Sequence, residues 1–296
     1  MSARIIDGRA VARRILAETR SEIESIDMTP GLGVIMVGDD PASKVYVRKK
    51  MEAAKRIGVH FESLVFPQDT DEETIVRAVT EMNARDDIHG IVVQLPLPKG
   101  LDTDRIVRTI DPDKDVDGFH PELIRRMSQD PDCRLPGLVE GLKLLFDETG
   151  LELNGQRTVI ISNSEVFSHP LKLFLERQGA GVETVRGDSP NLASALGQAD
   201  LLITAVGRPG LVTGQMLKPG TVILDVGTTR VDGRVVGDVE FETASEVAGW
   251  ITPVPGGVGP VTVAMLLHNV ARLAKTKRRR ITKNKPNAAA RHRIGD

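Results

Sequence analysis

Two residues that could do acid–base chemistry, Tyr46 and Lys50, lie one helical turn apart. Positions i and i+4 of a helix share a face, so both side chains would reach the same ligand. A lysine in a cleft can exchange a proton near neutral pH, because desolvation lowers the pKa of an ammonium group. A tyrosine can stack on a planar ligand and form a hydrogen bond. A lone helical lysine is also commonly a solvated surface side chain, and that alternative stays open here.

Two further polar residues follow segments that would place them at a ligand site. Gln94 ends an apolar stretch that begins at His89, and this stretch predicts a buried strand. Ligands of open parallel sheets bind at the carboxyl ends of strands, where Gln94 falls. Asp117 lies in the acidic segment 113–121, DKDVDGFHP, whose lack of periodicity predicts a rigid loop. Its Asp-x-Asp-Gly pattern is equally typical of an ordinary turn.

The segment 253–260, PVPGGVGP, holds three prolines and three glycines, so it cannot form a helix interior or a central strand. Glycine permits positive φ and lets another group approach the backbone. Apolar residues at helical spacing follow from 261 to 274, and Pro260 and Thr262 suit the first turn of that helix. Free N–H groups at a helix start favour an anionic or polar ligand. Taken alone, the loop also fits an ordinary Pro/Gly turn.

The elements that position these residues alternate between helices and strands, which indicates parallel α/β sheets. In the first half, the patterns predict helix 5–26, strand 31–37, a helix between Ser43 and Gly58, strand 61–66, helix 71–83 and strand 89–94. In the second half, they predict helix 138–149, strand 158–161, helix 169–178, strand 182–185, helix 192–198, strand 199–205 and strand 222–226. The second half therefore has the pattern of a Rossmann-like sheet. The last helix must pack back on the first domain or across the cleft.

Length and composition favour two soluble domains. The chain has 296 residues, 40% of them hydrophobic and only 3% aromatic, so aliphatic side chains must build the cores. A single cysteine, Cys133, excludes an intrachain disulfide and a cysteine-based zinc site. No apolar run is long enough for a membrane span or a signal region, which predicts a cytoplasmic protein without a membrane partner. No cluster of His, Asp and Glu has metal-ligand spacing, so we expect no metal.

The charge is divided unevenly along the chain. Residues 275–296 hold nine Lys/Arg and one acid, whereas residues 1–274 carry 30 basic and 40 acidic groups. The basic end lacks apolar periodicity, which predicts a disordered tail that could contact nucleic acid or an acidic partner. Because the body offers no basic or aromatic platform, nucleic acid is not an expected partner, and a solvated terminal extension is the favoured interpretation.

Six segments in order resemble those of the bifunctional methylenetetrahydrofolate dehydrogenase/methenyltetrahydrofolate cyclohydrolase family. They are VGDDPAS at 37–43, Tyr46-Val47 with Lys50, VQLPLP at 93–98, KDVDGFHP at 114–121, GDV at 237–239 and the loop 253–260. Together the similarity spans residues 2–275. It implies a folate domain, a Rossmann domain that binds NADP, and a cleft between them. It also implies a homodimer formed through the nucleotide domain. The implied reactions are hydride transfer from 5,10-methylenetetrahydrofolate and hydrolysis of the 5,10-methenyl product to 10-formyltetrahydrofolate.

The resemblance also implies roles for individual residues. Lys50 matches the catalytic lysine, Tyr46 would stack on the folate, and Gln94 would orient Lys50. Asp117 matches the acid that accepts hydrogen bonds from the pterin, and the loop 253–260 would lie over the folate. Further substrate contacts are implied at Val93, Leu95, Pro253, Gly256 and Gly257. We therefore expect a folate domain at 1–139 completed by a returning helix at 260–277, a nucleotide domain at 140–259, and a basic disordered tail at 278–296.

The sequence departs from the family pattern in the nucleotide loop. Where the family has Gly-Arg-Ser-x-x-Val-Gly-x-Pro, this chain has SNSEVFSHP at 162–170, so both glycines are serines and the arginine is Asn163. Asparagine cannot supply the charge that helps bind the 2′-phosphate of NADP. A family serine near that phosphate falls at Gly187, and its neighbour Arg186 could substitute or be a solvated loop residue. The implied cofactor contacts are Ser162, Asn163, Ser164, Arg186, Gly187 and Thr228, with NADP the expected cofactor and NAD an alternative.

A second departure lies before the linking helix, where the family has Pro-Cys-Thr-Pro-x-Gly and this chain has PGLVEG at 136–141. The family segment Asn-x-Gly-Arg is LIRR at 123–126, of which only Arg126 matches. Three interpretations remain open: a bifunctional enzyme with atypical cofactor contacts, a paralogue that is mainly a cyclohydrolase, and a non-catalytic folate- or partner-binding protein. The altered 162–168 loop separates the first interpretation from the second.

Overall fold

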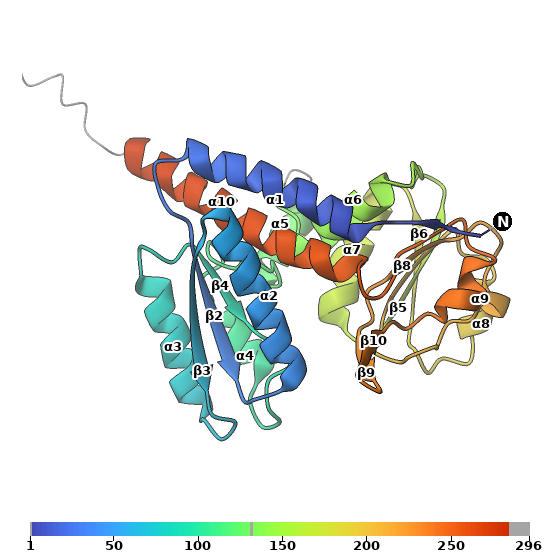
Figure 1. Cartoon of the computed structure of the whole chain (residues 1–296), viewed down its shortest axis with the longest axis horizontal. Helices are drawn as coiled ribbons and strands as arrows, with labels where there is room; N and C mark the ends of the chain where they lie inside the picture. The colour runs from blue at the N-terminus through green and yellow to red at the C-terminus, as the bar shows by residue number, and fades with distance from the viewer. Residues whose placement is uncertain (1, 131–132, 284–296) are drawn as a thin grey trace, which may run out of the picture. The chain divides into compact units, whose positions relative to one another are not determined.

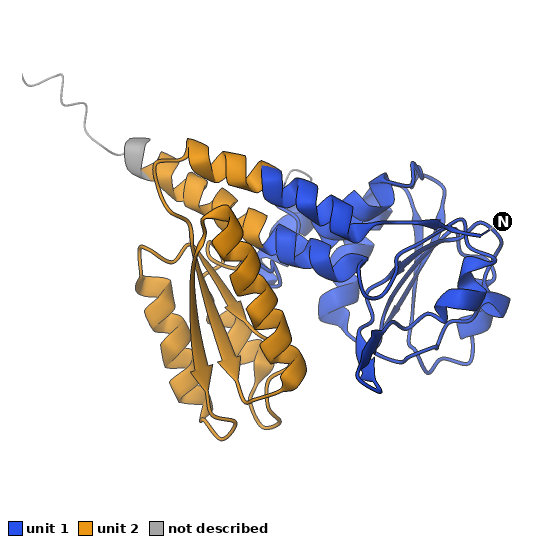
Figure 2. Ribbon diagram, in the orientation of Figure 1, with its two compact units in different colours: residues 1–17, 116–266 blue, residues 18–115, 267–296 orange. Residues whose placement is uncertain are grey.

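The computed structural model describes residues 2–130 and 133–283, and the chain divides into two compact units (Figure 2). Unit 1 combines the residues up to 17 with 116–266, and unit 2 combines 18–115 with the residues from 267 onward. Each unit holds a parallel sheet covered by helices, so the predicted two-domain α/β class is confirmed. The border between the units falls at 115/116, whereas the sequence patterns place a domain border at 139/140.

Unit 2 is built on a three-stranded parallel sheet in the order β3-β2-β4. The central strand β2 (Gly31–Val37) is buried at every residue, which explains its continuous apolar sequence. It lies between the edge strands β3 (His60–Phe66) and β4 (Gly90–Val93). The connecting helices are α2 (Pro41–Ile57), α3 (Glu72–Ala84) and α4 (Thr103–Arg108) (Figure 1). The strand and helix order predicted for this half is therefore confirmed, although α4 was not predicted.

Unit 1 contains a six-stranded sheet in the order β1-β11-β8-β7-β5-β6, with every neighbouring pair parallel. The strands are β1 (Arg4–Ile5), β5 (Arg157–Ser162), β6 (Gly181–Val185), β7 (Leu201–Ala205), β8 (Val222–Asp225) and β11 (Trp250–Ile251). The helices confined to this unit are α5 (Pro121–Gln129), α6 (Gly137–Asp147), α7 (Glu165–Arg177), α8 (Leu192–Leu196) and α9 (Phe241–Ser245), with a 3₁₀ turn η1 (Gly214–Met216). A hairpin of β9 (Thr229–Val231) and β10 (Arg234–Val236) forms a separate two-stranded sheet.

Both faces of the six-stranded sheet are covered. Along β7, Leu201 and Ile203 belong to one apolar cluster and Leu202 to another, as the two-residue period of a strand requires. The first cluster includes residues of α6 and α7, and the second includes residues of α8 and α9. Burial on both faces explains why these strands read as apolar runs. The Rossmann-like pattern predicted for this half is confirmed.

Two long helices, α1 (Gly8–Ser25) and α10 (Val258–Lys283), each supply residues to both units and lie side by side (Figure 1). Within unit 2, the Thr19 hydroxyl lies 3.2 Å from Nδ1 of His268, and Lys275 forms an ion pair with Glu22. Within unit 1, a Cβ on Gly8 would lie only 1.8 Å from the carbonyl oxygen of Gly257. The start of α1 therefore packs directly on the loop that precedes α10.

The last helix differs from its prediction at both ends. α10 begins at Val258, inside the predicted loop 253–260, because Pro260 can occupy the first turn of a helix. It continues to Lys283, so residues 278–283 are helical and the prediction of a disordered tail is wrong for them. The remaining predicted tail, 284–296, lies outside the described residues. α7 begins at Glu165, four residues before the predicted start, because Pro170 lies inside that helix and does not mark its first turn.

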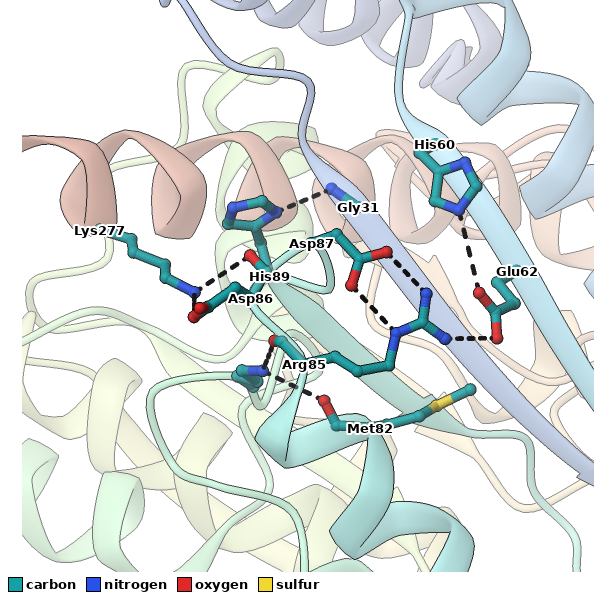
Figure 3. A network of polar contacts seen from close by, with 10 residues as sticks. Gly31, His60, Glu62, Met82, Arg85, Asp86, Asp87, His89 and Lys277 are labelled. Carbon is teal, nitrogen blue, oxygen red and sulfur yellow. Dashed lines mark hydrogen bonds and ion pairs between the residues drawn. The ribbon is translucent and has the colours of Figure 1, made fainter.

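At the amino-terminal edge of the unit 2 sheet, buried and charged groups hold α3 and α10 in place (Figure 3). The buried ammonium of Lys114 donates to the carbonyls of Met82, Asn83 and Arg85 at 3.1, 2.7 and 2.6 Å, so it caps the end of α3. Burial lowers the pKa of Lys114. Lys277 of α10 donates to the Asp86 carboxylate at 2.6 Å. Similar ion pairs join Arg278 to Asp27 and Arg280 to Asp113. The basic side chains near the end of α10 thus pair with acidic residues of unit 2.

Candidate active site

A lysine–glutamine contact forms at the carboxyl edge of the unit 2 sheet. The Lys50 ammonium donates to Oε1 of Gln94 at 2.9 Å. The Gln94 amide in turn donates from Nε2 to the carbonyl of Leu95 at 2.8 Å, and its backbone N–H donates to Ile35 at 2.8 Å. Gln94 is therefore held at its backbone and at its side chain, and its amide oxygen faces Lys50. Both side chains are half-buried.

The sequence around α2 explains why Lys50 reaches this place. The chain turns after β2 at Gly38, whose φ of +83° suits glycine. The Asp40 carboxylate then caps α2 by accepting from the Ser43 N–H at 2.7 Å, with Pro41 in the first turn. The hydrogen bonds from Ser43 lower the pKa of Asp40, which keeps the cap ionised. Because the helix start is fixed by this cap, the rotation of α2 and the face that carries Lys50 are fixed as well.

The neighbouring predicted residues differ in what they offer a ligand. Tyr46 lies one turn before Lys50 on α2, is half-buried, and has the Lys49 ammonium 5.8 Å from its ring centroid. Val93 is only 5% exposed and belongs to the unit 2 core, so its side chain is committed to packing. Leu95 is 43% exposed. Of these three, Tyr46 and Leu95 have surface available for a substrate.

Asp117 belongs to unit 1 and lies just after the border between the units. Its carbonyl accepts from the N–H of Gly137 at 3.1 Å, which ties its loop to the start of α6. The next residue, Gly118, has a φ of +82°, and a Cβ there would lie 2.6 Å from Cα of Pro136. Only glycine fits that position, so the backbone that presents the half-buried Asp117 is fixed by packing.

The loop before α10, also in unit 1, is equally restricted. The Gly257 N–H donates to the Pro253 carbonyl at 2.7 Å, and a Cβ on Gly257 would lie 2.5 Å from Cβ of Thr252. Gly256 has a φ of +122°, and a Cβ there would lie 3.2 Å from Nε of Arg9. The loop therefore has one defined conformation, with the Arg9 guanidinium beside it. Arg9 is a neighbour that the sequence patterns did not single out.

The altered loop between β5 and α7 is closed by its own serines. The Ser162 hydroxyl accepts from the Ser164 N–H at 3.0 Å and donates to the Ser164 carbonyl at 3.1 Å. The Ser168 hydroxyl donates to the same carbonyl at 3.0 Å. Ser162 and Ser168 are both buried, and they are the two positions at which the sequence resemblance implies glycine. Their hydroxyl groups are thus used within the turn, and the Ser164 side chain makes no capping bond at the start of α7.

The loop after β6 joins its neighbours through Gly187. The Gly187 N–H donates to Oδ1 of Asn163 at 3.3 Å, and its carbonyl accepts from Nη1 of Arg208 at 2.7 Å. Nε of Arg186 lies 3.2 Å from Oδ1 of Asp188. Asn163 and Gly187 are therefore in direct contact, and Arg186 is the chain neighbour of Gly187. Sequence analysis missed Arg208 and Asp188, although Arg208 follows the predicted strand 199–205, where its position at a carboxyl end was a usable signal.

Two buried carboxylates organise the end of β8, close in sequence to the predicted contact Thr228. Asp225 accepts from the N–H groups of Gly227, Asp238 and Val239 at 2.9, 3.2 and 2.9 Å. Asp238 accepts from the Thr204 hydroxyl and from the N–H groups of Val206 and Arg208 at 2.9, 2.8 and 2.8 Å. Burial raises the pKa of Asp225 to about 7, against the lowering effect of the Val239 N–H. These bonds fix the loops that follow β7 and β8.

Among residues 2–130 and 133–283, no group of three or more His, Cys, Asp or Glu side chains is arranged to hold a metal ion. Within the same part of the chain, no helix is both long and apolar enough to cross a membrane.

Comparison with solved structures extends the similarity to the whole fold. The bifunctional FolD of Campylobacter jejuni is 35% identical, with a TM-score of 0.88 over 93% of this chain and all of that one. The Trypanosoma brucei enzyme, solved with NADP and an inhibitor, is also 35% identical, with a TM-score of 0.90 over 94% of this chain and 99% of its own.

Comparison with known sequences gives the same result. The bifunctional protein FolD of Dechloromonas aromatica is 42% identical over 281 residues, which are 94% of this chain and 99% of that protein. Two family models match consecutive parts of the chain. Residues 6–117 match the catalytic domain of tetrahydrofolate dehydrogenase/cyclohydrolase, and residues 136–278 match its NAD(P)-binding domain. With both domains present in order over nearly the full length, this chain belongs to the tetrahydrofolate dehydrogenase/cyclohydrolase family.

Proposed function

We propose that this protein catalyses two consecutive steps of one-carbon folate metabolism. It oxidises 5,10-methylenetetrahydrofolate to the 5,10-methenyl form with NADP, and it hydrolyses that product to 10-formyltetrahydrofolate. The observation that carries this proposal is the 2.9 Å contact between Lys50 and Gln94 at the carboxyl edge of the unit 2 sheet. Full-length similarity to proteins named as bifunctional supports both steps.

In the hydrolytic step, Lys50 exchanges protons with the folate nitrogens. Water adds to the cationic carbon between N5 and N10, the C–N5 bond breaks, the formyl group stays on N10, and one proton is released. A positioned ammonium or amine can relay the proton from the added water to N5. Gln94 is the positioning residue, because its amide oxygen accepts from the Lys50 ammonium while its own amide is anchored to Leu95.

The remaining substrate contacts follow from side-chain chemistry. The Tyr46 ring stacks on the folate, and the ionised Asp117 carboxylate accepts from the amino and N–H groups of the pterin, which form a donor edge. Further contacts come from the exposed Leu95, from the backbone of Val93, and from the loop residues Pro253, Gly256 and Gly257. The loop supports this role through its single conformation, which keeps backbone groups in place without a change on binding.

The carboxyl edge of the unit 1 sheet fits a dinucleotide. The start of α7 has N–H groups that the Ser164 side chain does not cap, and such a helix start binds a pyrophosphate. The implied contacts lie at this edge: Ser162 ends β5, and Asn163, Ser164, Arg186, Gly187 and Thr228 follow the ends of strands. When bound, NADP supplies the acceptor for the hydride. The protein's part is to hold the cofactor through these residues, and Asp225 fixes the loop that leads to Thr228 by accepting from the Gly227 N–H.

The interpretation as a cyclohydrolase without dehydrogenase activity is not favoured. That interpretation rests on the loss of both glycines from the loop 162–168. The serines at these positions, however, form hydrogen bonds with the Ser164 backbone, so their hydroxyl groups are satisfied within the turn. A non-catalytic binding protein is disfavoured by the contact between Lys50 and Gln94. We also propose a homodimer formed through unit 1 and a cytoplasmic location. Family resemblance supports both, and β6, an edge strand of the sheet, could pair with a second copy.

The test is to supply 5,10-methylenetetrahydrofolate and follow reduction of NADP, and separately to supply 5,10-methenyltetrahydrofolate and follow its decay without cofactor. Lys50→Ala should lower the methenyl decay rate by about 10²- to 10⁴-fold, the usual contribution of a positioned proton-transfer group. Lys55→Ala is the matched control, because Lys55 is an exposed lysine later on the same helix. Equal rates for the two variants would overturn the role of Lys50. Methenyl decay without NADP reduction in the wild type would exclude the dehydrogenase.

A further inference from the structure

Three loops of unit 1 meet at one residue, Gly187, at the carboxyl ends of β5, β6 and β7. The Gly187 N–H is bonded to the Asn163 side chain, and its carbonyl is bonded to the Arg208 guanidinium. A Cβ on Gly187 would lie 3.3 Å from Val206 and 3.4 Å from Leu211, so a side chain there would crowd the loop after β7. The glycine thus allows Arg208 to lie directly against the loop after β6.

The charges around Gly187 are two guanidinium groups and one carboxylate. Arg186 and Asp188 flank Gly187 in sequence and form an ion pair, and Arg208 reaches the same place from the loop after β7. The pKa of Asp188 is lowered first by its hydrogen bond to Arg186 and also by the charge of Arg208, which places Arg208 within electrostatic range of that carboxylate. The three side chains together carry one net positive charge.

In Rossmann folds, the end of the second strand is where the adenosine ribose is recognised. An acid there binds the 2′-hydroxyl of NAD, and an arginine binds the 2′-phosphate of NADP. Guanidinium groups bind phosphate through paired N–H donors. Asn163 has no charge to offer a phosphate, and Nε of Arg186 faces Asp188. The residue at this edge with a fixed position and further donors is Arg208.

We propose that Arg208, assisted by Arg186, is the residue that selects NADP by binding its 2′-phosphate. This inference rests on the proposed use of NADP. Arg208 is anchored at both ends: its backbone N–H donates to the buried Asp238 at 2.8 Å, and Nη1 donates to Gly187 at 2.7 Å. A guanidinium has five N–H donors and Arg208 is exposed, so donors remain that a phosphate can reach. Asp188 opposes the phosphate and competes for Arg186, so it weakens the preference that Arg208 creates.

The test compares two fragments of the cofactor that differ only in the 2′-phosphate. Binding of 2′,5′-ADP and of 5′-AMP to the full-length protein is measured by calorimetry, which needs no turnover. The wild type should bind 2′,5′-ADP the more tightly. Arg208→Gln should lower the affinity for 2′,5′-ADP by about tenfold or more, the loss expected for a charge-assisted pair, and leave 5′-AMP binding unchanged. Asp188→Asn should raise the affinity for 2′,5′-ADP alone.

Arg157→Gln is the matched control, because Arg157 is an exposed arginine at the opposite, amino-terminal end of β5. The proposal is overturned if Arg208→Gln weakens both ligands equally, since that pattern indicates a structural role, or if it weakens neither. It is also overturned if the wild type does not distinguish the two ligands. NADP reduction and methenyl decay by the wild type are measured separately, so failure of the 2′-phosphate site and failure of the proposed function give different results.

Discussion

The Lys50 site of unit 2 and the cofactor edge of unit 1 are both carboxyl edges of parallel sheets, yet they differ in what fixes them. At the first, two side chains contact each other directly: Lys50 lies on a helix that Asp40 caps, and Gln94 directly follows strand β4. At the second, the bonds connect side chains to the backbone of neighbouring loops, as Asn163 and Arg208 do at Gly187. A site made of side-chain pairs requires particular residue types, so it can be recognised in the sequence. A site made of backbone groups can change its sequence and keep its shape.

The largest effect, on the unfolding free energy, is expected from a substitution that disrupts only the carboxyl edge of the unit 1 sheet. In Gly237→Ala the new Cβ would lie 2.0 Å from Oδ2 of Asp225, a carboxylate held by three backbone donors. We expect a loss of at least about 3 kcal/mol of unfolding free energy, as for other severe overpacking, measured by denaturant titration. Gly181→Ala, whose Cβ would have no neighbour closer than 3.9 Å, is the control. Similar losses in both variants would show that Asp225 does not fix this edge.

The next effect would break only the unit 2 site. Gln94→Leu removes the acceptor for Lys50 while keeping a side chain of similar size. Methenyl hydrolysis should fall by about 10- to 100-fold in kcat, because the proton-transfer group loses its orientation, and 2′,5′-ADP should bind as in the wild type. A change in KM alone, with kcat unchanged, would mean that Gln94 binds the substrate without positioning Lys50.

A smaller effect is expected in the pH dependence of the unfolding free energy, to which Asp225 of unit 1 contributes. Because the folded pKa of Asp225 is raised to about 7, the folded protein keeps a proton that the unfolded chain loses near pH 4. Between these values the unfolding free energy should therefore decrease as pH rises, by at most about 1.4 kcal/mol per pH unit. Asp225→Asn should flatten this slope. Asp200→Asn should retain it, because hydrogen bonding to Lys218 lowers the pKa of Asp200 and moves its titration below this range. An unchanged slope in Asp225→Asn would refute the assignment.

The smallest effect concerns the serines of the altered loop. Ser162→Gly restores a glycine of the family pattern but removes both bonds to Ser164. We expect about 1 kcal/mol of lost stability and a change in NADP affinity of less than about threefold, measured by thermal unfolding and by calorimetry. If NADP bound ten times more tightly to the variant, Ser162 would be an obstacle to the cofactor phosphate. Its hydrogen bonds to Ser164 would then not explain how the loop accepts NADP.

Sequence patterns predicted the elements with strong periodicity and missed those defined by distant partners. The strand 31–37 was predicted with its observed limits, because burial on both faces leaves a continuous apolar run. β1 and β11 are two residues long and exist only by pairing with each other and with β8, so local patterns do not reveal them. The starts of α10 and α7 were predicted too late, and in both helices a proline, Pro260 or Pro170, lies inside the helix near its start.

The candidate site was predicted to a similar degree. The proximity of Lys50 and Gln94 was implied by the family resemblance, and the structure has their contact. The roles of Asp117 and of the 253–260 loop stay predictions. Arg208 and the carboxylates of Asp225 and Asp238 were missed, because a single arginine or aspartate after a strand has no distinctive spacing. Their importance lies in bonds to the backbone of other loops, which no local pattern records.

The pairing of β1 with β11 also determines the order in which the molecule can be assembled during synthesis. Residues 4–5 are synthesised long before their partners at 250–251. The sheet of unit 2 needs only residues 31–93, so it can fold while translation continues. The six-stranded sheet cannot be completed until β11 is synthesised, and β1 remains unpaired until then. A translation pause or truncation before residue 250 would therefore release a chain that has the three-stranded sheet but an open edge in the larger sheet, which is a template for aggregation.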